Sequence, residues 1–145
     1  MKAQSVILTH TLLIAISVAL IFVVVLTFTN MRSSYQDATI SDGLSRVCLS
    51  MKAGMEKIYS DTGFLPQNDT LLGSVDLLLP DSISDIKYRT YFLDGTLYAS
   101  SLDGRSESCK IGLDAMYMGS TGGGDTRIDF MQMGNGTKMF SVEKV

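Results

Sequence analysis

The sequence predicts an α+β protein in which a long N-terminal helix precedes a small antiparallel, β-rich, sandwich-like head. Two observations predict this class. The first part of the chain is apolar at almost every position and then becomes striped at helical spacing, whereas in the second part apolar and polar residues alternate. The chain has 145 residues, 46% of them hydrophobic, which leaves room for one modest domain beside an apolar segment.

The first element, over residues 4–31, is predicted to be a membrane-spanning helix. Residues 3–31 contain no Lys, Arg, Asp or Glu, and the stretch 11–29 (TLLIAISVALIFVVVLTFT) is almost wholly aliphatic or aromatic. At a rise of about 1.5 Å per residue, residues 3–31 would form a helix of about 43 Å, whereas the hydrocarbon core of a bilayer is about 30 Å thick. A cleaved secretory signal has a shorter apolar core, so we expect this segment to be retained. Lys2 favours a cytoplasmic N-terminus and a head outside the cell.

Over residues 32–62 the helix is predicted to continue as an amphipathic segment. No proline occurs between Asn30 and Ser60, so nothing ends the helix at the membrane boundary. Apolar residues recur there every three or four positions with charged residues between them, which indicates that one face packs on the head. Gly63 and Pro66 then supply stop signals. The predicted packing stripe consists of Ile40, Leu44, Val47, Met51, Met55 and Ile58.

The head, residues 63–145, is predicted to contain five or six short antiparallel strands. The segment DIKYRTYFL alternates in polarity, and Asp94-Gly95 links it to TLYASS as a hairpin. Asp103-Gly104 repeats this device, and Gly134-Asn135-Gly136 joins TRIDFMQ to TKMFSVEK. The segment GSTGGGDT is expected to be a glycine-rich loop. The pattern does not separate a sandwich from a single sheet packed on the helix, and we favour the sandwich.

Two pairs of residues fit a head that lies outside the cell. Asn68 and Asn135 each begin an Asn-X-Thr sequon in a turn-like stretch, so both are candidate N-glycosylation acceptors. Cys48 and Cys109 are the only cysteines, and their spacing is not that of a metal site. They could pair in an oxidising compartment and tie the helix to the strands, or they could be two separately buried thiols.

The residue types that carry enzyme chemistry do not form a recognisable set. The single histidine, His10, lies in or beside the apolar segment, which excludes a Ser-His-Asp arrangement in the head. Gly122-Gly123-Gly124 lacks the Lys-Ser/Thr pair of a phosphate-binding loop. Basic residues are dispersed in a chain of net charge −3, which argues against nucleic-acid binding. We therefore predict no catalytic activity, no metal site and no cofactor.

The start of the chain resembles the class III signal sequences of archaeal type IV pilins. In that family a prepilin peptidase cuts after a small residue that follows a basic one, often just before Gln. Lys2, Ala3 and Gln4 occupy these three places. The resemblance implies that residues 1–3 are a leader, removed between Ala3 and Gln4. It covers residues 1–60 by pattern, and the head is similar to pilin heads only in being strand-rich. Many pilins carry Glu where this chain has Leu8.

The resemblance implies a structural subunit, either major or minor, of an archaeal type IV pilus-like extracellular filament. Its expected partners are the membrane, the prepilin peptidase, the pilus assembly machinery and further copies of the chain, which would associate through their N-terminal helices as a homopolymer. The alternative is a permanently membrane-anchored extracellular domain with a binding or stator-like role that does not polymerise. The two interpretations differ in whether the helix ever leaves the membrane.

Overall fold

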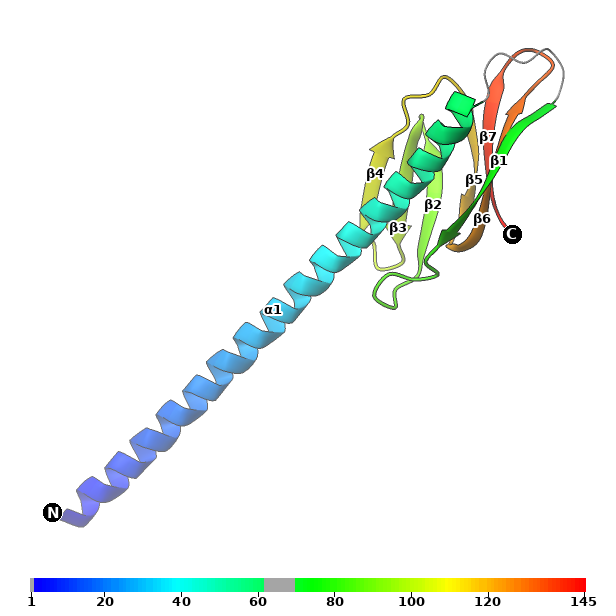
Figure 1. The fold of residues 1–145 in the computed structure, drawn as a ribbon. Coiled ribbons are helices and arrows are strands. Elements are labelled where there is room, and N and C mark those ends of the chain that lie inside the picture. The colour runs from blue at the N-terminus through cyan, green and yellow to red at the C-terminus, as the bar shows by residue number, and fades with distance from the viewer. Residues whose placement is uncertain (1, 62–69) are drawn as a thin grey trace. The chain divides into compact units, whose positions relative to one another are not determined.

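The computed structural model describes the backbone of residues 2–61 and 70–145 and the side chains of residues 10–61 and 70–145. Within these residues one helix precedes seven strands, which confirms the predicted α+β class (Figure 1). The elements are α1, Lys2–Asp61; β1, Thr70–Leu79; β2, Tyr88–Leu93; β3, Thr96–Ser101; β4, Ser106–Lys110; β5, Met116–Thr121; β6, Gly124–Gln132; and β7, Lys138–Lys144.

Helix α1 contributes to both of the compact units into which the chain divides. The first unit is Met1–Ala38, and the second, which we call the C-terminal unit, is Thr39–Val145. The amphipathic half of α1 therefore belongs to the same unit as all seven strands. The helix ends at Asp61, close to the predicted stop signals.

The strands form one sheet in the order β1-β6-β7-β5-β2-β3-β4, so the expected sandwich-like arrangement of the head is wrong. Every neighbouring pair is antiparallel except β5 and β7, which run parallel. A second sheet is not needed, because the amphipathic half of α1 packs on the sheet and supplies the second layer of the core (Figure 1).

The predicted hairpins are present, but the glycine-rich loop is much shorter than expected. Leu93 and Thr96 pair across a two-residue turn in which Asp94 and Gly95 both have positive φ, 49° and 71°, as a tight hairpin requires. Of the segment GSTGGGDT, only Gly122 and Gly123 lie between strands, since β5 ends and β6 begins within it. The rest is extended because its backbone pairs with other strands.

The sheet consists of two groups of strands that meet at a narrow joint. The group β1-β6-β7-β5 and the group β2-β3-β4 are connected by two residue pairs only, Thr90↔Thr121 and Tyr91↔Ser120, within the described residues. We call this joint the seam. By contrast, β6 and β7 pair over seven positions.

Candidate functional site

The apolar segment of α1, residues 11–31, exposes large apolar side chains on every side of the helix. Their exposed fractions range from 47% at Leu26 to 71% at Phe28. Among the described residues, α1 is the one helix that is long and apolar enough to cross a membrane, and none of its most apolar window is buried in the molecule. The exposed residues are Leu12, Leu13, Ile14, Ile16, Val18, Leu20, Ile21, Phe22, Val23, Val24, Val25, Leu26, Phe28 and Met31.

Hydroxyl groups within this segment are satisfied by the helix itself. Ser17, Thr27 and Thr29 each donate a hydrogen bond to the backbone carbonyl four residues earlier, at 2.9, 2.8 and 3.0 Å. Such bonds leave these side chains with no need for a polar neighbour. Either lipid tails or the apolar helices of other copies can therefore cover the segment without leaving a hydroxyl group unsatisfied.

Lys2, Ala3 and Gln4 begin α1, and Leu8 follows in the same helix. The backbone of these residues is helical, while their side chains lie outside the described residues. Cleavage between Ala3 and Gln4 remains a prediction. It would leave a helix that starts at Gln4.

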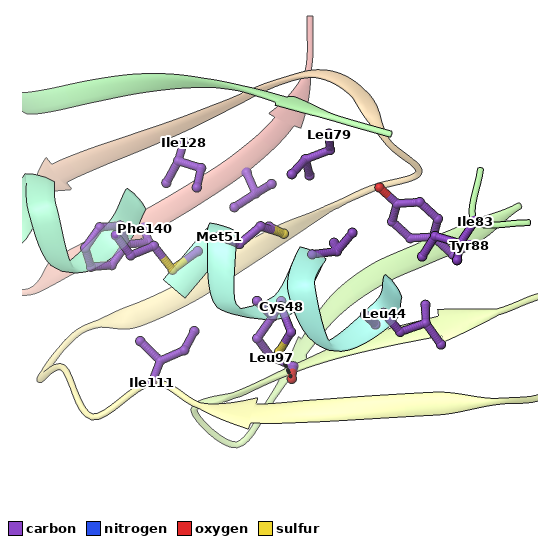
Figure 2. Packing of buried hydrophobic residues seen from close by; sticks show 14 of the residues in the cluster. Leu44, Cys48, Met51, Leu79, Ile83, Tyr88, Leu97, Ile111, Ile128 and Phe140 are labelled. Atoms are coloured by element: carbon purple, nitrogen blue, oxygen red, sulfur yellow. Dashed lines mark hydrogen bonds between the residues drawn. The ribbon is translucent and has the colours of Figure 1, made fainter. Parts of the chain in front are cut away.

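The six residues of the predicted stripe are all buried, with exposed fractions of 0–6%. Figure 2 shows Leu44 and Met51 pointing from the helix toward the strands, where Leu97, Ile128 and Phe140 complete the core. Their spacing of three or four residues places them on one face of the helix. The opposite face stays in solvent, as the exposed residue Leu49 illustrates.

Two glycines allow α1 to approach the rest of the C-terminal unit closely. A Cβ atom at Gly43 would overlap Cγ2 of Ile83 and lie 3.3 Å from its Cγ1 and Cδ1. A Cβ atom at Gly54 would lie 3.2 Å from Cδ1 of Leu77. Gly43 therefore leaves no room for a Cβ atom unless Ile83 shifts, whereas at Gly54 the end of the Leu77 side chain would have to move by only a few tenths of an ångström.

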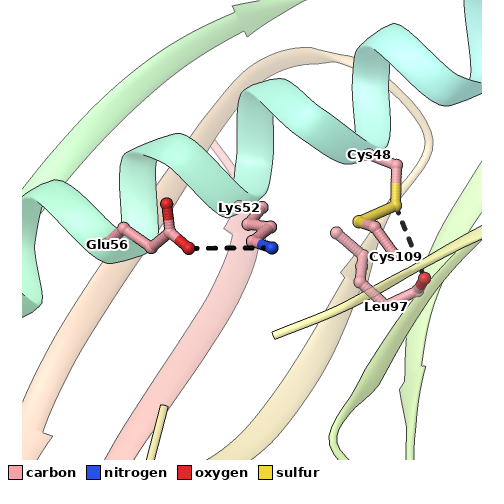
Figure 3. The surroundings of a disulfide bond; sticks show 5 residues. All are labelled: Cys48, Lys52, Glu56, Leu97 and Cys109. Atoms are coloured by element: carbon pink, nitrogen blue, oxygen red, sulfur yellow. Dashed lines mark hydrogen bonds and ion pairs between the residues drawn. A yellow bond between two sulfur atoms is a disulfide. The ribbon is translucent and has the colours of Figure 1, made fainter. Parts of the chain in front are cut away.

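A disulfide joins Cys48 of α1 to Cys109 of β4, with the two Cα atoms 6.1 Å apart (Figure 3). It holds the edge strand β4 against the helix. Cys48 Sγ also lies 3.5 Å from the carbonyl oxygen of Leu97, and since a disulfide sulfur carries no hydrogen this is a packing contact. The partly exposed ion pair Lys52–Glu56, 3.7 Å, lies nearby on the same helix and adds little stability.

Helix α1 contacts the strands on both sides of the seam. Toward β4, the Ser41 hydroxyl donates a hydrogen bond to the Glu107 carboxylate. Toward the other group, the Tyr59 ring packs on Phe130 of β6 with centroids 5.6 Å apart, and Lys138 Nζ of β7 lies 4.8 Å from the Tyr59 centroid. The helix therefore bridges the narrowest part of the sheet.

Three buried threonines reinforce the seam. Thr90 Oγ1 donates to the carbonyl oxygen of Thr121 at 3.2 Å and accepts from its backbone N–H at 3.3 Å. The hydroxyls of Thr121 and Thr126 lie 2.9 Å apart and share a hydrogen bond. Sequence reasoning missed this cluster, because its members come from three strands whose pairing is not evident from local pattern.

A buried tyrosine ties the segment between β1 and β2 to the sheet. The Tyr88 hydroxyl donates to the carbonyl oxygen of Pro80 at 2.7 Å. Burial, together with the nearby negative charge of Asp81, raises the pKa of Tyr88 to about 12.

On the outer surface, Asp76 and Arg127 form a bidentate ion pair with N–O distances of 2.8 and 3.4 Å. The hydrogen bond from Arg127 lowers the pKa of the Asp76 carboxyl.

The sequon at Asn135 lies in the exposed turn between β6 and β7. The side-chain oxygen of Asn135 accepts a hydrogen bond from the Thr137 backbone N–H at 2.9 Å. The other predicted acceptor, Asn68, lies outside the described residues.

In the part of the chain that the structure describes, no three His, Cys, Asp or Glu side chains come together as metal ligands. Comparison of the chain with protein-family models, curated proteins and solved structures finds no match.

Proposed function

We propose that this chain is a structural subunit of an archaeal type IV pilus-like extracellular filament, and that its N-terminal helix anchors it in the membrane before assembly. The observation that carries this proposal is the apolar segment, residues 11–31, which is exposed on every side of α1. The resemblance of Lys2, Ala3 and Gln4 to a class III cleavage site supports it from the sequence.

The apolar segment needs a surface that covers it and shields it from water. Burying one large apolar side chain is worth about 1.5–3 kcal/mol, so leaving this whole surface in water would cost on the order of tens of kcal/mol. A lipid bilayer supplies one cover and a bundle of the same segments from other copies supplies another. Because Ser17, Thr27 and Thr29 are satisfied internally, these three hydroxyls need no new hydrogen bonds when one cover is exchanged for the other.

The disulfide supports placement of the strands outside the cytoplasm. Disulfides persist in oxidising compartments and are rare where cytosolic thiols are kept reduced. The Cys48–Cys109 bond lies in the C-terminal unit, beyond the apolar segment in the chain. In this proposal the partners are other copies of the chain, the prepilin peptidase and the assembly machinery.

The test is mass spectrometry of the N-terminus combined with electron microscopy of sheared cell-surface material. The proposal expects a mature chain that begins at Gln4 and is present in filaments. A chain that keeps Met1 and stays in the membrane fraction would overturn it and favour the permanently anchored, non-polymerising domain.

A matched pair of variants tests the cleavage step. Ala3→Leu places a large residue before the proposed cut and is expected to leave the chain unprocessed. Ala19→Leu makes the same change within the apolar segment and is expected to be processed normally. If Ala3→Leu matures as the unmodified chain does, the cleavage site is wrong.

A further inference from the structure

We infer that Asn135 is an N-glycosylation site, where an oligosaccharide is transferred from a lipid-linked donor to the side-chain amide. The inference rests on the proposed function, because that function places the strands in a compartment where such donors are available. It goes beyond that function by assigning a covalent modification to one turn of the sheet.

The turn that carries Asn135 is exposed and held by its own backbone. The Met133 N–H donates to the Thr137 carbonyl at 2.9 Å, and the Gly136 N–H donates to the Met133 carbonyl at 2.8 Å. Gly136 has a φ of 83°, which suits glycine. These bonds fix the three residues of the sequon in one conformation at the end of the β6–β7 hairpin.

The acceptor amide presents its nitrogen for reaction. The Asn135 oxygen accepts the hydrogen bond from the Thr137 backbone, and among the described residues no hydrogen bond engages the amide nitrogen. Asn135 itself is exposed, so the donor's first sugar can approach without displacing a core residue. The nearest strand positions, Gln132 and Lys138, pair with each other and hold the hairpin closed behind the turn.

The transfer is a substitution at the anomeric carbon of the first sugar. The amide nitrogen of Asn135 forms a bond to the anomeric carbon of the first sugar, and the bond from that carbon to the donor's phosphate oxygen breaks. The phosphate leaves with the bonding electron pair, and one amide proton passes to a base of the transferase or to water. The Thr137 hydroxyl completes the sequon that the transferase recognises.

The experiment is peptide mass spectrometry of the full chain purified from its native cells. Trypsin cleaves after Arg127 and Lys138, so Asn135 is recovered in the peptide 128–138, separate from the peptide 58–87 that holds Asn68. We expect the peptide 128–138 to carry a hexose- or hexosamine-type mass increment. The unmodified peptide as the only form would overturn the inference.

Three variants locate the modification. Asn135→Gln removes the acceptor, and Thr137→Ala removes the hydroxyl while keeping every backbone hydrogen bond of the turn. Both are expected to lose the increment completely. Thr137→Ser keeps a hydroxyl and is expected to keep the increment. An increment that survives in Asn135→Gln would place the sugar elsewhere and refute the assignment.

Failure of this inference is distinguishable from failure of the proposed function. Filaments whose peptide 128–138 is unmodified would refute glycosylation alone. A modified peptide in a chain that stays in the membrane would refute filament assembly and uphold glycosylation at Asn135.

Discussion

Gly43 is predicted to be a position where the clash of a single methyl group cancels or outweighs the helix-propensity gain of alanine. In Gly43→Ala the new Cβ would overlap Cγ2 of Ile83, whereas non-bonded carbon atoms prefer about 3.5–4.0 Å. Ile83 cannot move away easily, because it is 9% exposed and its backbone makes two hydrogen bonds with Ile86, at 2.9 and 3.0 Å.

The magnitude follows from two opposing contributions. Replacing Gly by Ala in a helix interior stabilises the helix by about 1 kcal/mol. Overpacking a well-packed site costs about 1–3 kcal/mol. Gly43→Ala should therefore range from neutral to about 2 kcal/mol less stable. In Gly54→Ala the one tight contact is with the end of the flexible, half-buried Leu77 side chain at 3.2 Å, and the contacts with Val75 and Ile128, at 3.5 and 3.6 Å, are ordinary ones. This variant should therefore be neutral or up to about 1 kcal/mol more stable.

The assay is chemical unfolding of the full chain in detergent micelles, followed by tyrosine near-ultraviolet circular dichroism. The comparison of Gly43→Ala with Gly54→Ala cancels the helix-propensity gain that both share. Ile83→Leu keeps the side-chain volume but removes the branch at Cβ, so it should reduce the cost of Gly43→Ala in a double-mutant cycle. If Gly43→Ala is as stable as Gly54→Ala, the close approach of α1 to Ile83 is wrong.

Three further perturbations test the ties within the C-terminal unit. Reduction of the Cys48–Cys109 disulfide, whose partners are 61 residues apart, should lower the free energy of unfolding by about 4 kcal/mol in urea titrations, and an unchanged midpoint would contradict the tie. Thr90→Val leaves the Thr121 N–H without its side-chain acceptor and should cost about 1–3 kcal/mol in the same assay, and an unchanged midpoint would contradict a stabilising role for the Thr90 hydroxyl. The raised pKa of Tyr88 means that the unfolded chain ionises first, so its contribution to stability is full below pH 10.0 and is lost as the pH rises toward about 12. The difference in unfolding free energy between the unmodified chain and Tyr88→Phe should therefore shrink over that range, and a constant difference would contradict the assigned pKa.

Local pattern was sufficient for the helix, the stripe and the hairpins. Positions such as Leu44 and Met51 recur at helical spacing whatever they pack against, and Asp94-Gly95 specifies a tight turn by its own backbone preferences. The prediction of one face buried on the strands needed no knowledge of their order.

Features that depend on distant pairing could not be read in the same way. Strand β1 has a bulge between Leu71 and Gly73 that breaks the alternation, so its pattern is weak. Strand β5 contains Gly119, whose positive φ of 96° is unusual for a strand. The backbone of Val142 lies so close to this glycine that a Cβ atom would overlap it. The expected sandwich was wrong because the second layer of the core comes from α1, and sequence alternation reports only that a strand face is buried.

The seam has a mechanical consequence for the sheet when the chain is placed under tension. Two ladder pairs resist separation of the strand groups, so a pulling force across the sheet would concentrate there first. The amphipathic half of α1 spans the seam and reinforces it. It is joined to one strand group by the disulfide at Cys48 and contacts the other through the ring of Tyr59. The helix would therefore carry part of the force. The disulfide between Cys48 and Cys109 would limit how far the two strand groups can separate before the C-terminal unit unfolds.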